Sequence, residues 1–384
     1  MIGGLYVHIP FCLAKCQYCD FTSYPGRSNE DKDTYLQTLV KECQIYARMF
    51  RESSAYGEVS LESIYFGGGT PTCLTGGQLC FLLETIKESF PIQIGAEITV
   101  EGNPGTLDLP KLVDLYKGGF NRLSLGAQSF NLKELKLLGR IHTATETAQA
   151  FNWAREAGFT NIGLDLMYGL PGQALEHWQS NLQTALSFAP DHISLYQLKI
   201  EEGTPFYQRL SEGSLQEFPD DLAALMYEEA IRTLTGAGYL HYEISNFALP
   251  GRESRHNRLY WKNDCYIGIG AGASGYLPGV RYSNETVLDN YITLTNQGHR
   301  PVDSEENITT ELQLFEAVFL GLRLVEGLDK ESFFCRYGVR IEQIYGETIS
   351  RLKEQGLLQE DSLRIALSQK GLNLANLVFM EFLP

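Results

Sequence analysis

The stretch that decides the fold is Tyr6 to Phe21, which reads YVHIPFCLAKCQYCDF. An apolar, β-branched run predicts a strand, and it is followed at once by Cys12, Cys16 and Cys19 in the spacing C-x-x-x-C-x-x-C. Three thiolates can hold three irons of a four-iron cluster, which leaves the fourth iron open to a ligand that is not protein. The sequence therefore indicates an iron–sulfur site directly after the first strand.

Structural zinc is the alternative for clustered cysteines. Zinc takes four ligands, usually from two C-x-x-C pairs or from cysteines combined with histidines at matching spacing. The chain has no second pair of this kind, because His8 precedes the cysteines and Asp20 follows them. The spacing favours the iron–sulfur cluster and leaves zinc as the weaker reading.

Composition limits the classes of function. The chain has 384 residues, of which 43% are hydrophobic, so a sizeable core is expected. The net charge of −16 argues against a surface that tracks phosphates, and nucleic acid is not expected as a partner. The first residues lack the basic segment of a signal peptide, and no run approaches the roughly eighteen apolar residues of a membrane span. We expect a cytoplasmic protein.

Strand-like and helix-like segments alternate along the first two thirds of the chain, which is typical of parallel βαβ units. About six such units predict an α/β fold with a partial or complete (β/α) barrel over residues 1–248. The expected strands after the first are 60–68, 95–104, 121–130, 161–172, 191–198 and 240–248. The expected helices are 31–49, 76–90, 109–117, 143–157, 175–188 and 220–235.

The rest of the chain departs from this alternation. Residues 249–300 are rich in Gly, Asn and Tyr and are expected to form a connecting region that carries the motif HNRLYW at 256–261. Residues 301–384 show three helical patterns followed by strand-like pieces, which predicts a winged-helix-like α+β domain. Its acidic residues outnumber its basic ones, so docking against the barrel or a protein is favoured over DNA binding.

Polar and glycine-rich motifs fall at the ends of the predicted strands. GGGTP at 67–71 follows one strand, and Glu101, Gln128, Arg140 and Asp165 lie near the ends of others. Barrel active sites are assembled from the loops at these ends. Glycines allow a ligand to approach the backbone, an arginine can clamp a carboxylate, and Asp and Gln suit the hydroxyls of a ribose.

His256 opens the HNRLYW motif. A histidine beside a tryptophan is usually structural. A neutral imidazole can nevertheless ligate heme iron, and aromatic rings can flank a porphyrin. His256 is therefore a candidate heme ligand as well as a candidate structural residue.

Several motifs in order resemble one known group. YVHIPFCLAKCQYCDF, FGGGTP, LSLGAQSF and DLMYGLPG resemble the radical S-adenosylmethionine (SAM) enzymes of the HemN-like group, the oxygen-independent coproporphyrinogen III oxidases, and the tail is similar to that group's C-terminal domain. The coproporphyrinogen dehydrogenases carry a further cysteine in C-x-x-x-C-x-x-C-G-C, where this chain has Asp20 and Phe21 after Cys19. HNRLYW resembles instead the H-N-x-x-Y-W motif of HemW-type heme chaperones, which makes these the closer likeness.

The resemblance implies a set of ligand-binding roles and no assigned catalytic residue. The cluster, a [4Fe-4S] cluster, would be held by Cys12, Cys16 and Cys19. The residues that would surround S-adenosyl-L-methionine are Gly68, Gly69, Thr70 and Glu101 at the methionine end, Arg140 at the carboxylate, Gln128 and Asp165 at the ribose, and Tyr6 and Tyr18 beside the cluster and adenine. His256 would be the heme ligand.

The function that the resemblance implies is a heme chaperone, which binds heme as cargo and delivers it to apo-hemoproteins with the help of an electron donor. The alternative is a radical SAM enzyme that acts on coproporphyrinogen III or another tetrapyrrole. The resemblance leaves open whether SAM is cleaved, whether the chain forms a homodimer, and whether partners bring it to a membrane as a peripheral protein.

Overall fold

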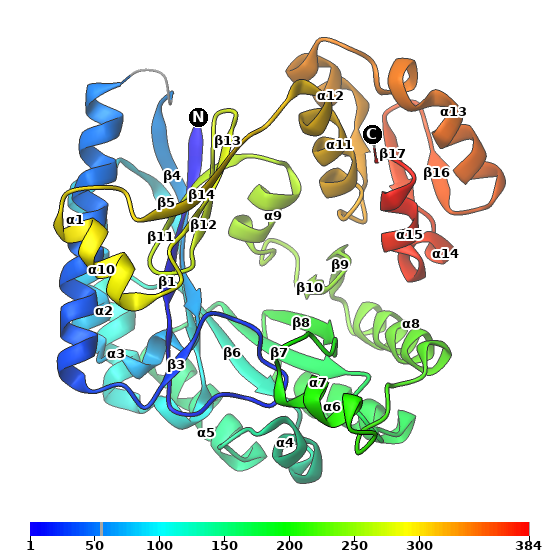
Figure 1. The fold of residues 1–384 in the computed structure, drawn as a ribbon. Coiled ribbons are helices and arrows are strands. Elements are labelled where there is room, and N and C mark those ends of the chain that lie inside the picture. The colour runs from blue at the N-terminus through cyan, green and yellow to red at the C-terminus, as the bar shows by residue number, and fades with distance from the viewer. Residues whose placement is uncertain (54–56, 384) are drawn as a thin grey trace.

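The computed structural model describes residues 1–53 and 57–383 and is organised around one sheet of twelve strands (Figure 1). The strand order is β14-β13-β12-β11-β1-β4-β5-β6-β7-β8-β10-β9. The seven central strands pair in parallel: β11 (Cys265–Ile269), β1 (Ile2–Ile9), β4 (Val59–Gly68), β5 (Ile92–Gly102), β6 (Arg122–Gln128), β7 (Ile162–Tyr168) and β8 (His192–Gln197). Within the described residues the end strands β14 and β9 do not pair with each other, so the barrel is partial.

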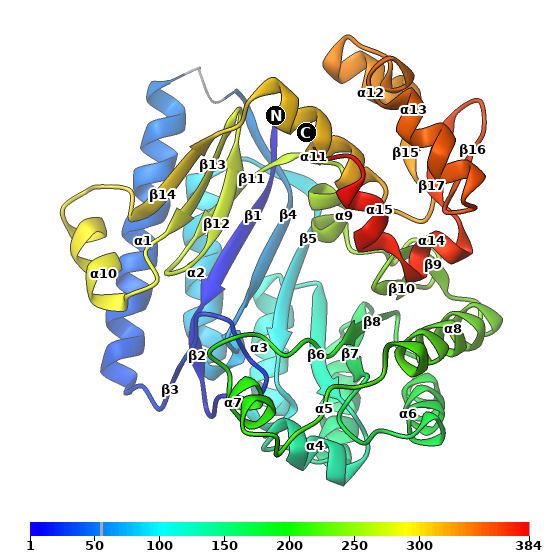
Figure 2. The same ribbon diagram turned by 45° about the vertical axis from the view of Figure 1, so that its right-hand side comes forward.

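Helices cover the outer side of the sheet (Figures 1 and 2). They are α1 (Asn29–Glu52), α2 (Gly76–Ser89), α3 (Leu109–Gly118), α5 (Ala144–Ala157), α6 (Leu175–Ser187) and α8 (Asp220–Gly236). The short helices α4 (Leu132–Leu138) and α7 (Pro205–Ser211) lie instead at the carboxyl ends of the strands. Capping boxes at Ser28, Thr75 and Thr143 start three of these helices, because each side chain accepts a hydrogen bond from an otherwise unpaired backbone N–H. The predicted α/β class with a parallel core is confirmed.

Residues 240–307 differ from the expected strand and connecting region. The segment 240–248 forms two short antiparallel strands, β9 (Leu240–Glu243) and β10 (Asn246–Ala248). Beyond the short helix α9 (Arg255–Trp261), β11 pairs with β1, and the sheet continues antiparallel through β12 (Ser274–Leu277), β13 (Val280–Asn284) and β14 (Val302–Asn307), with α10 (Leu288–Asn296) before the last strand. Most of the expected connecting region therefore belongs to the sheet.

Close backbone packing explains why this part of the sequence does not look like strands. A Cβ at Gly268 would lie 2.0 Å from the carbonyl oxygen of Ser274, and one at Gly275 would lie 2.3 Å from the Tyr282 ring. Glycine is needed where β11, β12 and β13 approach one another. These glycines interrupt the apolar alternation by which strands are recognised.

The C-terminal part is the α+β unit that the sequence predicts. Its helices are α11 (Thr310–Gly321), α12 (Lys330–Tyr337), α13 (Ile341–Glu354), α14 (Gln369–Asn373) and α15 (Ala375–Met380). They accompany an antiparallel sheet in the order β15 (Leu328–Asp329), β17 (Arg364–Leu367), β16 (Leu358–Glu360). Figure 2 shows this unit beside α9 and the β9–β10 hairpin. No helix in the described part of the chain is long and apolar enough to cross a membrane.

Candidate cofactor site

The carboxyl ends of the parallel strands surround a cavity of about 380 Å³. Parallel strands end at the same edge of a sheet, so side chains that are far apart in sequence meet there. The residues predicted for cluster and SAM that line the cavity are Cys12, Cys16, Tyr18, Cys19, Gly68, Gly69, Thr70, Glu101, Gln128, Arg140 and Asp165. Tyr6 and His256 do not line it.

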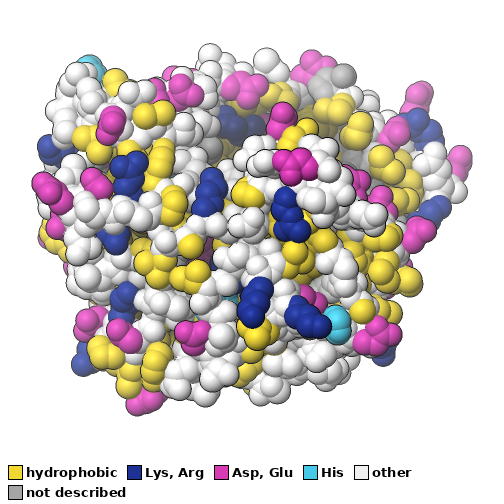
Figure 3. All heavy atoms as spheres, turned by 60° about the horizontal axis from the view of Figure 1, so that its bottom comes forward, with side chains coloured by type: hydrophobic (Ala, Val, Ile, Leu, Met, Phe, Trp, Pro, Cys, Tyr) yellow, Lys and Arg dark blue, Asp and Glu magenta, His cyan; other side chains and the backbone are white. Residues whose placement is uncertain are grey.

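Figure 3 views the molecule from the side on which α4, α5 and α7 lie in Figure 1. Basic, acidic and apolar side chains are interspersed on this face, and no single sign of charge covers it. A nucleic-acid backbone would require a basic surface. This side of the molecule has no such surface.

The cysteine loop is tied at both ends. Next to Cys12, the short strand β2 (Phe11–Cys12) pairs in parallel with β3 (Tyr24–Pro25), which closes the loop. In the middle of the loop, the backbone N–H of Gln17 donates to the carbonyl of Leu138 at 3.0 Å. The carbonyl of Gln17 accepts from the N–H of Phe206 at 3.0 Å. The end of α4 and the start of α7 therefore hold the cysteines against the cavity.

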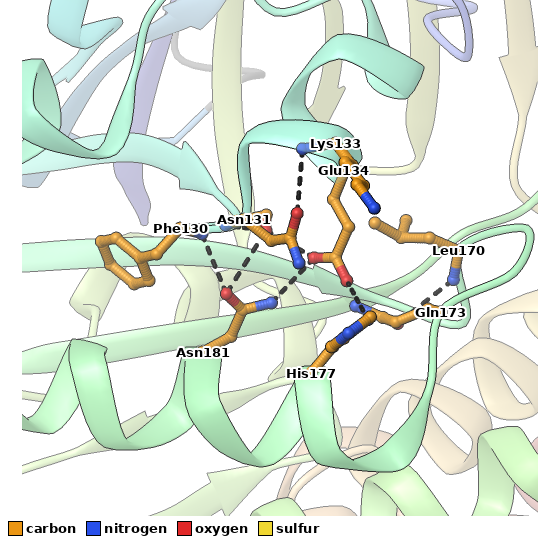
Figure 4. A network of polar contacts seen from close by, with 9 residues as sticks. Phe130, Asn131, Lys133, Glu134, Leu170, Gln173, His177 and Asn181 are labelled. Atoms are coloured by element: carbon orange, nitrogen blue, oxygen red, sulfur yellow. Dashed lines mark hydrogen bonds and ion pairs between the residues drawn. The ribbon is translucent and has the colours of Figure 1, made fainter.

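The α4 anchor rests on a buried carboxylate network (Figure 4). Glu134 is 6% exposed and accepts hydrogen bonds from the Ser129 hydroxyl at 2.5 Å and the Asn181 amide at 2.9 Å. The Asn181 side-chain oxygen accepts from the N–H of Phe130 at 2.9 Å. These bonds join the end of β6, α4 and α6, so the helix that holds the cysteine loop is itself fixed.

The thiols suit cluster ligation chemically. Burial raises the pKa of Cys12 and of Cys19 above the ordinary value, so ligation, which needs thiolates, would release protons. Arg140 Nη1 lies 3.6 Å from the Cys16 sulfur, which places a cationic group next to the cysteine loop. Among residues 1–53 and 57–383, no three His, Cys, Asp or Glu side chains are placed to hold a single metal ion. Three neighbouring thiols on one cavity fit the ligands of a larger, four-iron group.

The glycine-rich end of β4 passes directly against this loop. A Cβ at Gly68, where φ is +114°, would meet the His8 ring at 2.7 Å, and one at Gly69 would meet the Phe11 carbonyl oxygen at 2.9 Å. Space therefore favours glycine at both positions, and at Gly68 the left-handed backbone conformation does so as well. Thr70 follows, with its hydroxyl 3.6 Å from the Cys12 sulfur.

Two half-buried carboxyl groups, Glu101 and Asp165, face the cavity. Burial raises the pKa of Glu101 to about 7 and outweighs the hydrogen bond that Tyr65 donates to it at 2.7 Å. Burial also raises the pKa of Asp165, which accepts a hydrogen bond from the Ser124 hydroxyl at 3.1 Å. Both groups can accept hydrogen bonds from a ligand, and each becomes a stronger acceptor once ionised.

Gln128 and Arg140 occupy strained or incompletely paired positions. Gln128 has φ +64° at a bulge in β6, a conformation that non-glycine residues rarely adopt outside functional or turn positions. Arg140 Nη2 donates to the Gly126 carbonyl at 2.7 Å, and its Nε is buried without a partner among the described residues. Because Nε is enclosed, the donors left for a ligand are the N–H groups of Nη1 and Nη2 that these contacts do not use.

Tyr6 lies away from the cavity, in contrast to its expected place beside the cluster and adenine. Residues two apart on a strand share a face, and the Tyr6 hydroxyl bonds to His8 Nδ1 at 3.0 Å on that face of β1. The ring lines a different hollow. Strand alternation, which fixes the direction of each side chain, is the reason for the difference.

His256 is enclosed rather than available. It is 1% exposed, its Nδ1 lies 2.9 Å from the Ser63 hydroxyl, and its Nε2 lies 2.8 Å from the Tyr260 hydroxyl. Burial lowers its pKa to about 3. A heme iron could reach neither nitrogen without displacing one of these partners. The arrangement supports the structural reading of this residue.

The HNRLYW helix, α9, links the sheet to the C-terminal unit. At its start, the N–H groups of Arg255 and His256 both donate to Glu97 of β5 at 3.2 Å. At its end, the Arg323 guanidinium lies 4.3 Å from the centroid of the Trp261 ring. The helix α9 is therefore held by the sheet at its start and by the C-terminal unit at its end.

Sequence reasoning passed over several lining residues, among them Ser124, Met167, Tyr196 and Lys199. Met167 stands two residues after Asp165, and Ser124 four residues before Gln128. Spacing by two along a strand was the signal that could have found them, because alternate residues face the same side.

The fold and the site define a radical SAM protein with a HemN-type tail. The radical SAM superfamily model matches residues 6–185, and the model of the HemN C-terminal domain matches residues 308–374. The solved structure of coproporphyrinogen III oxidase (HemN) from Escherichia coli is similar with a TM-score of 0.85 and 26% identity, covering 99% of this chain and 90% of that one.

Relatives that match the chain along its whole length show which family within the radical SAM class it belongs to. "Heme chaperone HemW" of Bacillus subtilis is 40% identical and covers 98% of each chain. The protein of the same name from Lactococcus lactis is 40% identical over 99% of this chain and 97% of its own. The chain belongs to the HemW family.

Proposed function

We propose that the protein is a heme chaperone that carries a [4Fe-4S] cluster and SAM and delivers heme to apo-hemoproteins. The observation that carries the proposal is the convergence of the cysteine loop, the glycine-rich strand end and two half-buried carboxyl groups on one cavity. Relatives named heme chaperones supply the cargo. Reduction of the cluster would call on an electron donor.

In this proposal the residues of the cavity hold and orient the cofactors. Cys12, Cys16 and Cys19 hold the cluster, which together with SAM supplies one-electron chemistry when bound. Arg140 pairs with the ligand carboxylate through its spare donor, and Glu101 faces the cationic end of the ligand. The remaining roles fall to Gly68, Gly69, Thr70 and Tyr18 along the walls and to Gln128 and Asp165 at the ribose.

A tetrapyrrole enzyme is the second candidate. The likeness to HemN over 99% of the chain favours it, because both units of the molecule are shared. Asp20 and Phe21 stand where the coproporphyrinogen dehydrogenases carry an additional cysteine, and this departure favours the chaperone.

One experiment separates the two. The anaerobically reconstituted protein is loaded with heme and mixed with an apo-hemoprotein, while a parallel sample receives coproporphyrinogen III, SAM and reductant. The chaperone predicts recovery of hemoprotein activity and no protoporphyrinogen. Cys16→Ala should lose the cluster, and Cys335→Ala, at an exposed position far along the chain, should behave like the wild type. Accumulation of protoporphyrinogen would establish the enzyme instead.

A further inference from the structure

Arg122 of β6 is a buried arginine that, in the part of the chain the structure describes, forms no ion pair. It is 2% exposed, whereas arginines are seldom buried without a charged partner. Its one hydrogen bond among the described residues is a long one of 3.5 Å to the Thr99 hydroxyl, and its Nε is enclosed without a partner. A guanidinium keeps its charge even when it is buried. The sheet therefore encloses a positive charge that is not used up by a direct contact.

The place of Arg122 on its strand puts it directly below the cofactor cavity. Residues two apart on a strand face the same side, so Arg122 shares a face with Ser124, which lines the cavity and donates to Asp165 at 3.1 Å. In the register of the sheet, Arg122 pairs with Thr99 of β5. Ser124 pairs with Glu101. The guanidinium thus starts one pleat below the two carboxyl groups of the cavity.

The charge of Arg122 acts on both of these carboxyl groups. Burial raises the pKa of Glu101 and of Asp165, and the positive charge of Arg122 lowers both pKa values in part. The two carboxyl groups also raise each other's tendency to hold a proton, since like charges repel. A cation on the enclosed side offsets this repulsion without occupying the space of a ligand.

The other titratable groups around this cluster do not supply a second enclosed cation. Burial lowers the pKa of both nearby histidines, so they are neutral at physiological pH. Arg140 stands at the cavity, where it contacts the cysteine loop. The groups that face the two carboxyls or Arg122 are Tyr6, Tyr65, Glu97, Arg140, His192, Tyr196, Tyr242, His256 and Tyr260.

We propose that Arg122 is a positioning residue of the cofactor site, whose enclosed charge keeps Glu101 and Asp165 in their ionised form around neutral pH so that they can bind SAM. The inference rests on the proposed function and names a residue that sets the charge of its site. Arg122 itself does not line the cavity, so it acts through the two carboxyl groups. With a neutral side chain in its place, both groups would hold their protons to a higher pH.

A pH profile separates this role from a direct effect of Arg122 on the ligand. Arg122 also repels the sulfonium of SAM, but both groups are charged at every pH, so the repulsion changes the affinity by the same factor throughout. The effect on the carboxyl groups depends on their protons and moves the pH at which the affinity rises. The midpoint of the profile therefore reports the positioning role, whereas the affinity at a single pH does not.

The test is calorimetric titration of SAM into the anaerobically reconstituted, full-length protein at a series of pH values. The wild-type affinity should rise through about pH 7. In Arg122→Met, which keeps much of the length and removes the charge, the midpoint should move upward by about one pH unit. Arg122→Lys, which can hold a charge beside these carboxyl groups, should lie closer to the wild type. Arg232→Met removes an arginine that is 73% exposed on α8, and this matched control should keep the wild-type midpoint.

The possible results point to different conclusions. If the wild type binds no SAM, the proposed function and this inference fall together. If the wild type binds SAM and Arg122→Met keeps its midpoint, the positioning role is wrong and the proposed function stands. A uniform loss of affinity at every pH would likewise overturn the role, because disturbed packing alone has that effect. Arg122→Gln is the second neutral variant, and its midpoint decides the question if Arg122→Met does not retain the cluster.

Discussion

At the scale of single residues, burial decides the chemistry of the cavity. Desolvation raises the pKa of Glu101 to about 7, although the hydrogen bond from Tyr65 and the charge of Arg122 both lower it. A carboxyl group with this pKa is divided between its two forms at neutral pH. Its charge is therefore sensitive to whatever binds next to it.

Glu101 gives the first prediction. The sulfonium of SAM is positive at every pH, and an ionised Glu101 attracts it, so the affinity for SAM should rise as the pH increases through about 7. Glu101→Gln cannot ionise and should lose this part of the pH dependence. Calorimetry measures the SAM affinity of wild type and of Glu101→Gln at the same set of pH values. Protonation of SAM itself affects both proteins equally, so it cancels in the difference between their affinities. Parallel pH profiles would contradict the role.

His256 gives the second prediction. Its removal leaves the hydroxyls of Ser63 and Tyr260 buried without their partner and opens a cavity. His256→Ala should therefore lower the free energy of unfolding by about 2–4 kcal/mol. His299→Ala, at an exposed side chain that makes no hydrogen bond within the described residues, should change it by less than about 0.5 kcal/mol. Urea unfolding measures both. A fully stable His256→Ala that no longer binds heme would restore His256 as the ligand.

At the scale of elements, a buried carboxyl group joins the first helix to the last strands of the sheet. Glu42 of α1 accepts hydrogen bonds from the N–H of Gly270 at 2.8 Å, the Asn284 amide at 2.7 Å and the Tyr291 hydroxyl at 2.5 Å. Burial raises its pKa to about 7 from an ordinary 4.5. The part of the sheet beyond β11, together with α10, is thus bonded to α1, the helix that follows the cysteine loop.

The third prediction concerns this contact. Between pH 4.5 and about 7 the folded chain holds a proton on Glu42 that the unfolded chain has released. The stability from this proton is complete below pH 4.5 and is lost as the pH rises through about 7. Glu42→Gln does not titrate. The stability of wild type relative to this variant should fall as the pH rises across the window, measured by urea unfolding. A constant difference would contradict it.

Much of the barrel was predictable because its signals are local. Alternating strands and helices and the motifs at strand ends indicated the parallel sheet, and parallel strands bring their ends together, so the cofactor cavity followed. The pairing of β1 with β11 joins residues 2–7 to 265–269. No local sequence pattern predicts a partner so far along the chain. The enclosure of His256 depends on that pairing, so the sequence alone could not choose between its structural role and a ligand role.

At the scale of the whole molecule, the C-terminal unit is fixed to the sheet near β11. Arg336 of α12 donates to the carbonyls of Lys262 at 2.8 Å and Asn263 at 2.5 Å and pairs with Asp264 at 3.1 Å. Arg323, which lies over the Trp261 ring at the end of α9, adds a second contact. The two arginines therefore hold the C-terminal unit against residues 261–264, which join α9 to β11.

The fourth prediction is that this arginine holds the two units together. Arg336→Ala removes two exposed contacts and one part-buried contact and should cost about 1–2 kcal/mol. Limited proteolysis should then cut faster between the sheet and the C-terminal unit. Arg340→Ala is the matched control, since Arg340 is 57% exposed and pairs loosely with Glu331 at 3.9 Å. Equal cleavage rates for both variants would show that the units are held elsewhere.

The central claim is that the loop of Cys12, Cys16 and Cys19 and the strand ends facing it form one cluster and SAM site. Electron paramagnetic resonance of the anaerobically reconstituted, reduced protein tests it most directly. The account predicts a [4Fe-4S] signal that changes when SAM is added, that persists without this change in Arg140→Ala, and that is absent in Cys16→Ala. A protein that takes up zinc in place of iron and sulfide, or a cluster signal indifferent to SAM, would contradict it.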